Sequence, residues 1–539
     1  MRRMIVWIAL LVFFSPALHA RAEPPAEATP ALERAGTLLA GEALPGVPGG
    51  PRSQLVTADE ARTVATNWIA QILHCYGRWG DATAAEVVEV RELKLGERLL
   101  GYICRVQPQG FVVVSLRREL EPVKAYSESC GLDPQAQEGL ADVIKGGMER
   151  ILDAVEQTAG PVTSAPAEEV QRLLQFDYSP AWERLELPVD AFRRGLASAS
   201  EVLDDCQAGG VMVTSTWDQD EPYNEHCPEM RCWEQNHNGR ARVGCMATAA
   251  AQIMRYWCWP PYGVDSPYSD SYDWPNMPDS FTSPPAPPWQ QIAAVAELCY
   301  EVGLAAGMDY GCTESGAPLG AAPGKDVLDG YEDHFRYDSG AEIIARGNAC
   351  PADVWFAFIR ADLERNRPIQ YRIEGSSFLP LASGHSMVVD GWRISGGHQQ
   401  YHVNYGWGQS VMCDSHYCNC WYTVDSLYAS ETRAYEMMLL GVRPINALGT
   451  RLADGWYSRP SFPYRYFDGN ATGDDAHFDA GQYLQFLSGV KLVCTGSKIG
   501  FRGWSTGNTY LYTQAPGARG VRIHSGHIYL FKGGGIRLY

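Results

Sequence analysis

The feature that most constrains the fold of this chain is an apolar stripe at helical spacing in residues 245–257. Its apolar side chains recur three and four positions apart: Met246, Ala249, Ala250, Ile253, Met254 and Trp257. This period predicts a helix with one buried face. Cys245 precedes the stripe and follows Gly244, so we expect its thiol at the first turn. The partial positive charge at a helix N-terminus favours the thiolate, the nucleophilic form of cysteine.

An inert buried cysteine, or one half of a disulfide, fits this segment equally well. A nucleophilic thiol needs an imidazole partner that stabilises it and later protonates a leaving group. His385 is a candidate, because it follows Gly384 and begins an apolar run that ends in Asp390-Gly391. An Asp-Gly pair after a strand predicts a hairpin turn, with residues 401–408 as the return strand.

Three further residues fit a site around Cys245 and His385. Asn404 on the return strand could hold the imidazole in position, and Trp407 could shield that contact from water. Gln219, upstream of the cysteine, could donate its amide to an oxyanion together with the Cys245 backbone N–H. Taken singly, each of these residues is equally compatible with core packing. Together their order along the chain, Gln, Cys, His, Asn, is that of papain-like peptidases.

The motifs resemble those of streptopain-type peptidases, the C10 family of cysteine peptidases. Residues 244–254 look like the nucleophile helix of that family, and four other segments follow in the same order: residues 308–311, 384–391, 402–408 and 440–444. Residues 57–127 resemble the inhibitory propeptide of these zymogens. The resemblance spans about residues 57–444 and leaves the C-terminal tail outside it.

The resemblance implies a zymogen with a Cys245–His385 dyad, an oxyanion role for Gln219 and activation by loss of the propeptide. It also implies polypeptide substrates with an apolar P2 residue, a cleft lined by Ser315 and Gly384, and neither metal nor cofactor. Two positions depart from the family pattern. Tyr405 stands where tryptophan usually follows the asparagine, and Gln409 stands where glycine is usual.

Two other classes of function remain open from the sequence. A secreted binding or adhesion protein could keep this fold without activity, and an acyltransferase could use the same thiol. Retention of Cys245, His385, Gln219 and Asn404 together argues against the first. A propeptide of the inhibitory type argues against the second, because a destructive activity is the kind that must be held latent until export.

The N-terminus predicts export. Arg2 and Arg3 precede an apolar run over residues 5–14, and small residues follow at Ala20 and Ala22. This is the order of a secretory signal peptide, and the run is too short to span a bilayer. No later run is longer and equally apolar, so we expect a secreted protein without a membrane span. The formal net charge of −19 excludes nucleic acid as an expected partner.

Fifteen cysteines in an exported chain predict disulfides, and the odd number leaves at least one thiol outside an intrachain bond. The short spacings Cys227/Cys232 and Cys413/Cys418/Cys420 invite local bridges, although connectivity does not follow from sequence. A zinc site made by the latter three cysteines with His416 is an alternative. Its spacing is not a usual zinc arrangement, and oxidation competes outside the cell.

We therefore expect an α+β chain in which a papain-like cysteine peptidase domain is preceded by a small α+β prodomain and followed by an all-β C-terminal domain. The expected boundaries are signal peptide 1–22, Pro/Ala/Gly-rich linker 23–56, inhibitory propeptide-like domain 57–205, peptidase domain 206–444 and β-rich domain 445–539. The short Gly-punctuated runs of the last domain suit a β-solenoid. Its aromatic residues suit a cell-surface or glycan ligand, and a stabilising cap without a ligand fits them equally well.

Overall fold

The computed structural model describes residues 53–444 except 137–138, 175, 199–205, 234–237, 261, 282–286, 318–325, 347–349, 374–383, 409–418 and 424–435; beyond residue 444 it describes only the backbone of short strands. The predicted signal peptide and nearly all of the predicted linker lie outside these residues. No helix in the described part of the chain has the length and apolar character needed to cross a membrane.

The N-terminal part begins with helix α2 (Ala58–Tyr76), as its three- and four-residue apolar spacing predicts. Thr57 caps this helix: its side chain accepts from the Glu60 backbone N–H, and Glu60 bonds back to the Thr57 backbone. Four antiparallel strands and four helices follow: β1 (Glu86–Leu95), β2 (Arg98–Gln107), β3 (Phe111–Ser115), β4 (Val123–Ser127), α3 (Gly139–Ala159), α4 (Ala167–Gln171), α5 (Ser179–Leu185) and α6 (Val189–Ser198). In the sequence, two strand-like runs at residues 99–106 and 110–116 are joined by the turn-prone residues 107–109, and this pattern predicts β2 and β3. Both strands are confirmed.

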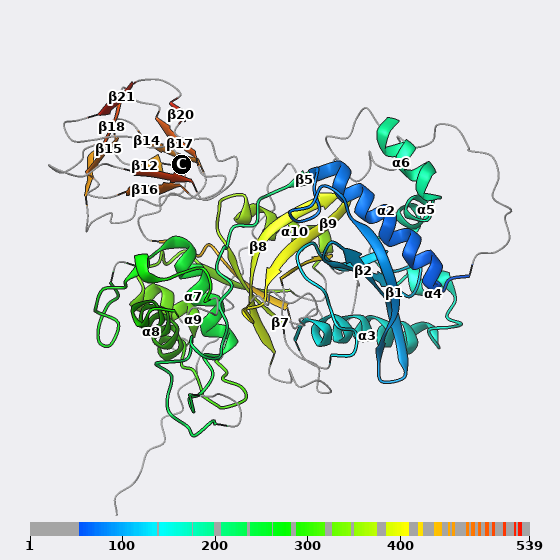
Figure 1. The fold of residues 1–539 in the computed structure, drawn as a ribbon, viewed down its shortest axis with the longest axis horizontal. Coiled ribbons are helices and arrows are strands. Elements are labelled where there is room, and N and C mark those ends of the chain that lie inside the picture. Colours follow the sequence, from blue (N-terminus) through cyan, green and yellow to red (C-terminus); the bar gives the residue numbers. More distant parts are fainter. Residues whose placement is uncertain are drawn as a thin grey trace, which may run out of the picture. The chain divides into compact units, whose positions relative to one another are not determined.

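The second part places helices on a sheet (Figure 1). Its elements are β5 (Cys206–Ala208), α7 (Cys245–Trp257), η1 (Trp274–Asn276), α8 (Trp289–Ala305), α9 (Val327–Asp329), η2 (Gly330–His334), β6 (Glu342–Ala345), α10 (Ala352–Leu363), β7 (Ile369–Ile373), β8 (His385–Ser395), β9 (His398–Asn404), β10 (Cys420–Thr423) and β11 (Glu436–Leu440). The predicted helix after Gly244 is confirmed as α7, and it packs on β7 and β8. Helices and strands are mixed along the described chain, so the α+β class is confirmed.

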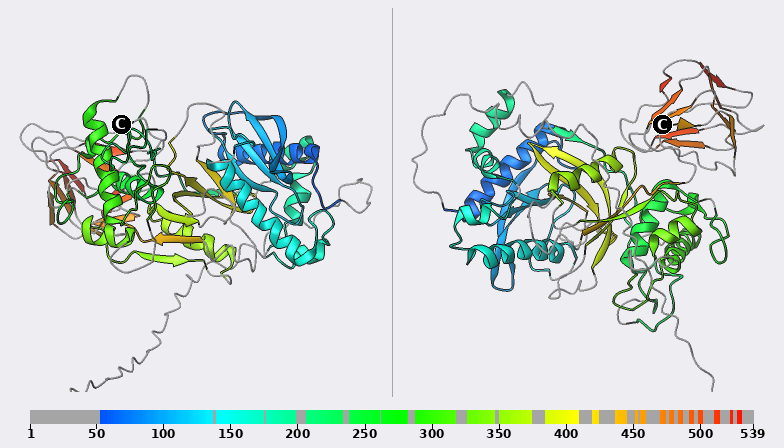
Figure 2. Two further views of the ribbon diagram at one scale, coloured as in Figure 1. Left: turned by 90° about the horizontal axis from the view of Figure 1, so that it is seen from below. Right: turned by 180° about the vertical axis from the view of Figure 1, so that it is seen from behind.

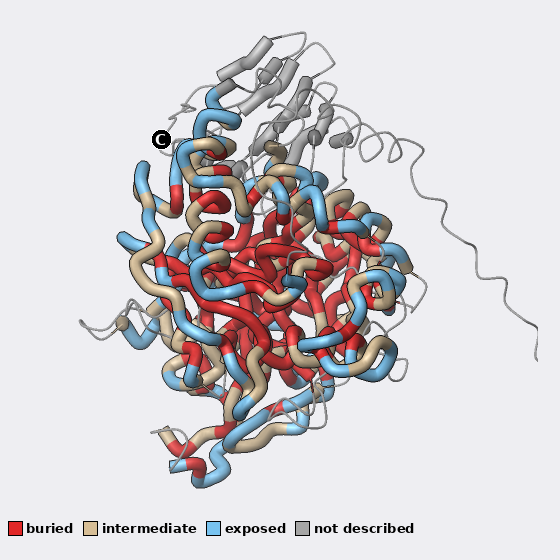
Figure 3. Tube along the Cα trace, turned by 90° about the vertical axis from the view of Figure 1, so that its right-hand side faces the viewer, coloured by how far each residue is buried: buried red, intermediate tan, exposed pale blue. Residues whose placement is uncertain are grey.

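One sheet runs through both parts of the molecule. Its strand order is β1-β2-β3-β4-β10-β9-β8-β7-β11-β6, with β5 paired to β8. The two parts meet where β4 pairs antiparallel with β10, with Tyr126 opposite Trp421. The yellow strands of the second part and the blue strands of the N-terminal part are neighbours in both views of Figure 2, as the strand order requires. Buried residues concentrate along this sheet and the helices that cover it (Figure 3).

The expected turn at Asp390-Gly391 is wrong. Strand β8 continues through these residues to Ser395, and the turn to β9 is made by Gly396 and Gly397, whose φ values are 59° and 83°. Asp390 is instead fully buried: its carboxylate accepts from the Val213 N–H at 3.1 Å and lies 2.6 Å from His402 Nδ1. A bulge in the β8–β9 ladder lies at this point, so the Asp-Gly pair bends the strand rather than ending it.

The expected bridge between Cys227 and Cys232 is wrong, and a bridge between Cys413 and Cys418 lies outside the described residues. Cys232 bonds Cys312, eighty residues later, while Cys227 is free and buried. Cys75 bonds Cys206. Cys420, a member of the alternative zinc set, is also a free and buried thiol, and the other three residues of that set lie outside the described part of the chain.

Backbone strands are described in the tail: β12 (Arg451–Leu452), β13 (Gly455–Ser458), β14 (Asn470–Gly473), β15 (Ala476–Asp479), β16 (Tyr483–Phe486), β17 (Lys491–Cys494), β18 (Lys498–Phe501), β19 (Tyr510–Thr513), β20 (Arg522–Ile523) and β21 (His527–Leu530). Short apolar runs between Gly, Ser and Asn residues in the sequence from 483 to 531 predict the last six of these strands, whereas β12–β15 were not expected. All pair in parallel with a strand 21 to 29 residues away, for example Asn470 with Lys491 and Lys498 with His527. Such pairing is typical of a β-solenoid. The expected run at residues 536–539 lies outside the described residues, and the all-β domain stays a prediction.

Candidate active site

Cys245 is the first residue of α7, and Gly244 brings it there. The φ of Gly244 is 88°, and a Cβ on this residue would lie 2.8 Å from both Met308 Sδ and the Ser315 carbonyl oxygen. Only glycine combines this backbone angle with so close an approach. The Cys245 sulfur accepts a hydrogen bond from the Ser386 backbone N–H at 3.3 Å. Burial raises the pKa of the Cys245 thiol, and the backbone N–H groups of Ser386 and Met246 oppose that rise only in part.

His385 is the first residue of β8, directly before the residue whose N–H contacts the thiol. Its ring is buried, and Nε2 lies 2.8 Å from the Tyr405 carbonyl oxygen. A carbonyl only accepts, so Nε2 donates and carries the hydrogen of the neutral ring. Burial lowers the pKa of His385 to about 4. The imidazole is therefore uncharged at neutral pH.

The Cys245 thiol contacts the residue that follows His385, but the described hydrogen bonds do not join the thiol to the imidazole. Among the described hydrogen bonds, Cys245 bonds the main chain of Ser386, and His385 bonds the main chain of Tyr405. The raised thiol pKa and the lowered imidazole pKa both favour the uncharged forms. The site has the residues for nucleophilic catalysis in an un-ionised arrangement.

Trp407 lies where a shield for the imidazole was predicted. Its ring stacks on His385 with centroids 4.3 Å apart, and the Tyr405 ring stacks at 6.2 Å on the same histidine. Tyr405 thus supplies both an aromatic neighbour and the carbonyl that orients the ring. This carbonyl was missed at the sequence level, because a main-chain contact leaves no side-chain signal in a sequence.

Gln219 contacts the segment before the nucleophile helix and the segment that follows β9. Its main-chain carbonyl accepts from Val243, two residues before Cys245, at 2.9 Å. Its side-chain amide donates to the Gly406 carbonyl at 3.4 Å, and Asp218 accepts from its backbone N–H at 2.6 Å. The amide therefore lies in the same neighbourhood as the thiol and the imidazole, and its long bond to Gly406 is weak.

Asn404 is held away from the imidazole in this conformation. Its amide nitrogen donates to the Ser215 carbonyl at 2.8 Å and to Gln252 Oε1 at 3.1 Å. Its oxygen accepts from Gln252 Nε2 at 3.2 Å and from the Gly406 N–H at 3.1 Å. The predicted orienting role of Asn404 is thus performed here by the Tyr405 carbonyl. Gln252, missed at the sequence level, was detectable as a polar residue on the buried side of α7.

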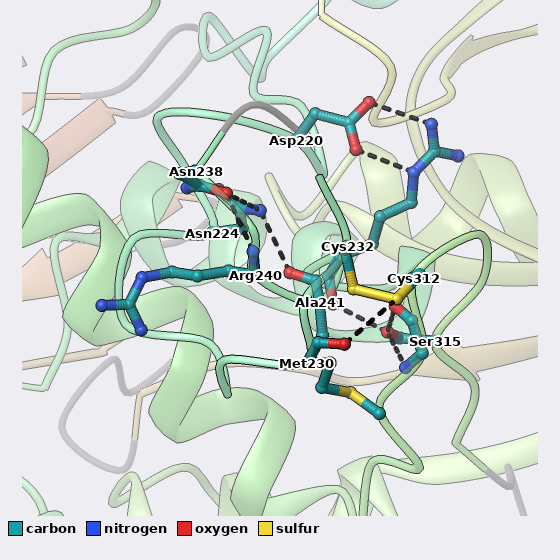
Figure 4. Close-up of a disulfide and its surroundings, with 11 residues drawn as sticks. Asp220, Asn224, Met230, Cys232, Asn238, Arg240, Ala241, Cys312 and Ser315 are labelled. Carbon is teal, nitrogen blue, oxygen red and sulfur yellow. Dashed lines mark hydrogen bonds and ion pairs between the residues drawn. A yellow bond between two sulfur atoms is a disulfide. The ribbon is translucent and has the colours of Figure 1, made fainter. Parts of the chain in front are cut away.

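Ser315 lies beside Gly244, the residue before the nucleophile, and Gly384 is the residue before His385. Gly384 precedes His385 with a φ of 88°. Ser315 is buried: its hydroxyl donates to the Arg242 carbonyl at 2.7 Å and accepts from the Gly311 N–H at 3.0 Å. The Cys232–Cys312 disulfide ties the same loop to residues 225–241 (Figure 4).

Arg242 connects this loop to the Gln219 segment. Its guanidinium lies 2.7 Å from the Asp220 carboxylate and donates to the Thr313 carbonyl at 3.2 Å. The loop, the nucleophile and the Gln219 segment are therefore braced as one unit. This ion pair was also missed, because the two residues lie apart in the sequence without a motif.

One group of carboxylates in the described part of the chain has a geometry compatible with a cation. Asp270, Glu297 and Glu301 offer oxygens within 4.8 Å of one another. Burial and mutual repulsion raise the pKa of Glu297 and of Glu301 to about 7, and Tyr272 donates to Glu301 at 2.5 Å. The group shares no residue with the Cys245 site, and we assign no metal to it.

Comparison with known proteins yields two family matches. Residues 217–417 match the Peptidase C10 family, and residues 53–151 match the Spi protease inhibitor model. Streptopain of Streptococcus pyogenes serotype M1 is 27% identical over 355 residues, which cover 61% of this chain and 77% of streptopain. The thiol protease/hemagglutinin PrtT of Porphyromonas gingivalis is 27% identical over 209 residues, which cover 36% of this chain and 22% of PrtT. Among solved structures, a fragment of Prevotella intermedia prointerpain A aligns with a TM-score of 0.46 and 21% identity, over 65% of this chain and 97% of the fragment.

Proposed function

We propose that this chain, a cysteine-type peptidase of the Peptidase C10 family with an inhibitory propeptide domain, is made as a latent endopeptidase that works through Cys245 and His385. The observation that carries the proposal is the position of the thiol. Cys245 begins α7 inside the matched peptidase region and contacts the residue that follows His385. A nucleophile and its base brought together from distant segments are the requirement for acyl transfer.

The chemistry follows from the groups present. When His385 turns toward the thiol, its unprotonated Nδ1 can accept the proton of Cys245, which forms a thiolate–imidazolium pair. The thiolate attacks the substrate carbonyl, and the resulting oxyanion accepts hydrogen bonds from the Cys245 N–H and the Gln219 amide. The imidazolium then protonates the leaving amine, and water hydrolyses the thioester. Trp407 stacked on the ring keeps water from the imidazole, and Asn404 stays a candidate to orient it once the Tyr405 bond is released.

The contacts of the N-terminal domain support an inhibitory role. Its strand β4 continues the peptidase sheet at β10, and Tyr126 donates to Gln400 Oε1 at 3.1 Å. Glu128 forms an ion pair with Arg393 on β8, the strand that begins with His385. These contacts join the N-terminal domain to the peptidase sheet, which supports the proposal that this domain keeps the precursor latent.

Substrate preference and place of action belong to the same proposal. We assign the substrate cleft to the loop of Ser315 and to Gly384, with an apolar P2 side chain in the substrate. The N-terminal signal and the disulfides support secretion. Residues 445–539 are assigned a role outside the chemistry, because Pro444 already closes the described core by a bridge to Tyr337.

The test is turnover of a peptide with an apolar P2 residue. Cys245→Ala and His385→Ala should each abolish hydrolysis, and combining them should add little, because the pair acts as a unit. Cys350→Ala is the matched control: this cysteine is not in a disulfide, is partly exposed and lies outside the site, so its loss should leave turnover unchanged. Normal turnover in either site variant would refute the assignment. Incorporation of an amine into the peptide, in place of cleavage, would point to the acyltransferase alternative.

A further inference from the structure

A disulfide crosses from the inhibitory domain into the peptidase region. Cys75 lies in the last turn of α2, inside the residues that match the inhibitor model. Cys206 opens β5, shortly before the residues that match the peptidase family. The two sulfurs are bonded, at a sequence separation of 131 residues. The bond therefore joins the two functional halves of the precursor.

The Cys206 end of this bond is built into the peptidase sheet. Strand β5 pairs antiparallel with β8, with Cys206 opposite Ser395 at the end of β8 remote from His385. The Cys75 end is seated on the same place: the Tyr76 hydroxyl lies 3.2 Å from the Gln207 carbonyl and 3.1 Å from the Ile394 carbonyl. Both ends of the bond are thus held by secondary structure, so it is part of the fold.

A cut anywhere between residues 76 and 205 leaves Cys75 on the N-terminal fragment and Cys206 on the C-terminal one. We propose that the cleaved propeptide remains covalently attached to the peptidase as a second chain, and that its release requires a thiol reductant. The effect of this attachment on latency rests on the proposed function. The attachment itself does not depend on catalysis.

Cys130, which follows β4 in the inhibitory domain, is also disulfide-bonded. It is therefore replaced together with Cys75 and Cys206 in the variants described below.

Covalent attachment raises the local concentration of the propeptide at the peptidase. A free propeptide is lost by dilution, whereas a tethered one rebinds at an effective concentration of the order of millimolar. Release proceeds by thiol–disulfide exchange. A thiolate of the reductant attacks one sulfur of the Cys75–Cys206 bond, and the other sulfur leaves as a thiolate. A second reductant thiolate then resolves the mixed disulfide, so the protein gains two thiols and the reductant is oxidised to its disulfide.

The attachment is tested without peptidase activity. The Cys245→Ala precursor is cut with a limited amount of trypsin, for which Arg193 and Arg194 on α6 are exposed sites between the two cysteines. The cut protein is then denatured and its mass measured with and without dithiothreitol. We expect one disulfide-linked species without reductant and two fragments with it. Fragments that separate without reductant would overturn the proposal.

Variants identify the bonds responsible. Replacing Cys75, Cys130 and Cys206 with serine should release the propeptide fragment without reductant. The matched control, Cys232→Ser with Cys312→Ser, removes a bond that lies wholly after the cut and should leave the fragments linked. If the triple variant does not fold, peptide mapping of the unreduced wild-type protein decides instead: it should contain a peptide pair joined through Cys75 and Cys206, and absence of that pair refutes the inference.

A second arm separates this proposal from the peptidase assignment. Cut wild-type enzyme, diluted without dithiothreitol, should stay at least tenfold less active on a peptide substrate than the cut triple-serine variant under the same conditions. If the cut wild-type enzyme, with its fragments still linked, is as active as the cut triple-serine variant, the attached propeptide does not control activity and that part of the proposal is refuted. Linked fragments together with no activity in any sample, reduced or not, would instead refute the proposed peptidase function and leave the attachment standing.

Discussion

The un-ionised arrangement of Cys245 and His385 predicts how the latent precursor should react with alkylating agents as the pH is changed. Burial lowers the pKa of His385 to about 4, so the imidazole is uncharged from about pH 5 upward and brings no positive charge to the thiol. Burial also raises the pKa of Cys245 above its ordinary value. A thiol at the ordinary pKa of about 8.5 is about 3% ionised at pH 7, and the buried Cys245 thiol should be ionised less than that.

The magnitude follows from this titration. Below its pKa, a thiol gains about tenfold in thiolate for each pH unit, so the alkylation rate of Cys245 should rise about 100-fold between pH 6 and pH 8. A thiolate–imidazolium pair behaves differently, because its thiol ionises near pH 4 and its rate is nearly constant over that range. The two arrangements therefore differ by about two orders of magnitude in one measured ratio.

The assay is iodoacetamide labelling of the intact precursor from pH 6 to pH 8, with the Cys245 peptide quantified by mass spectrometry. Cys350, which is partly exposed and not in a disulfide, serves as an internal reference thiol, and Cys245→Ala identifies the peptide signal. The intact mass is checked at each pH so that only uncleaved precursor is counted. A Cys245 rate that changes less than about twofold across this range would refute the un-ionised arrangement.

Three further perturbations test the same structure. Gln219→Ala should lower turnover about 10²- to 10³-fold with the fold intact, as loss of one oxyanion donor does, and unchanged turnover would leave Gln219 a structural role. Glu128→Gln breaks its buried ion pair with Arg393, which costs about 3 kcal/mol, so the precursor should hydrolyse peptide at pH 7 faster than wild type; equal latency would show that this contact does not hold the propeptide. In the folded protein the pKa of His385 lies below its ordinary unfolded value of about 6.5. The stability that depends on a neutral ring is therefore fully present above pH 6.5 and is lost as the pH falls toward 4. The free energy of unfolding of the wild-type precursor should therefore fall by about 3 kcal/mol more than that of His385→Gln over this range, measured by urea denaturation, and parallel curves would contradict the burial of the ring.

Local patterns predicted the elements that local physics controls. The apolar stripe after Cys245 gives α7, and the Thr57–Glu60 capping box marks the start of α2, because helix period and capping depend on residues within a turn or two. The hairpin turn was misplaced for the opposite reason. An Asp-Gly pair favours a turn locally, but the buried Asp390 finds partners in Val213 and His402, and these long-range contacts override the local preference.

By itself the sequence determined the order of the chemistry: a cysteine at a helix start, a histidine at a strand start, and the glutamine, asparagine and tryptophan that accompany them. Only the tertiary structure decided which of these groups meet. In the folded chain, the His385 ring hydrogen-bonds the Tyr405 carbonyl and Asn404 hydrogen-bonds Gln252. Cys75 forms a disulfide with Cys206. The physical reason is that hydrogen bonds and disulfides depend on distances of a few ångströms between residues far apart in the chain, and no local pattern encodes those distances.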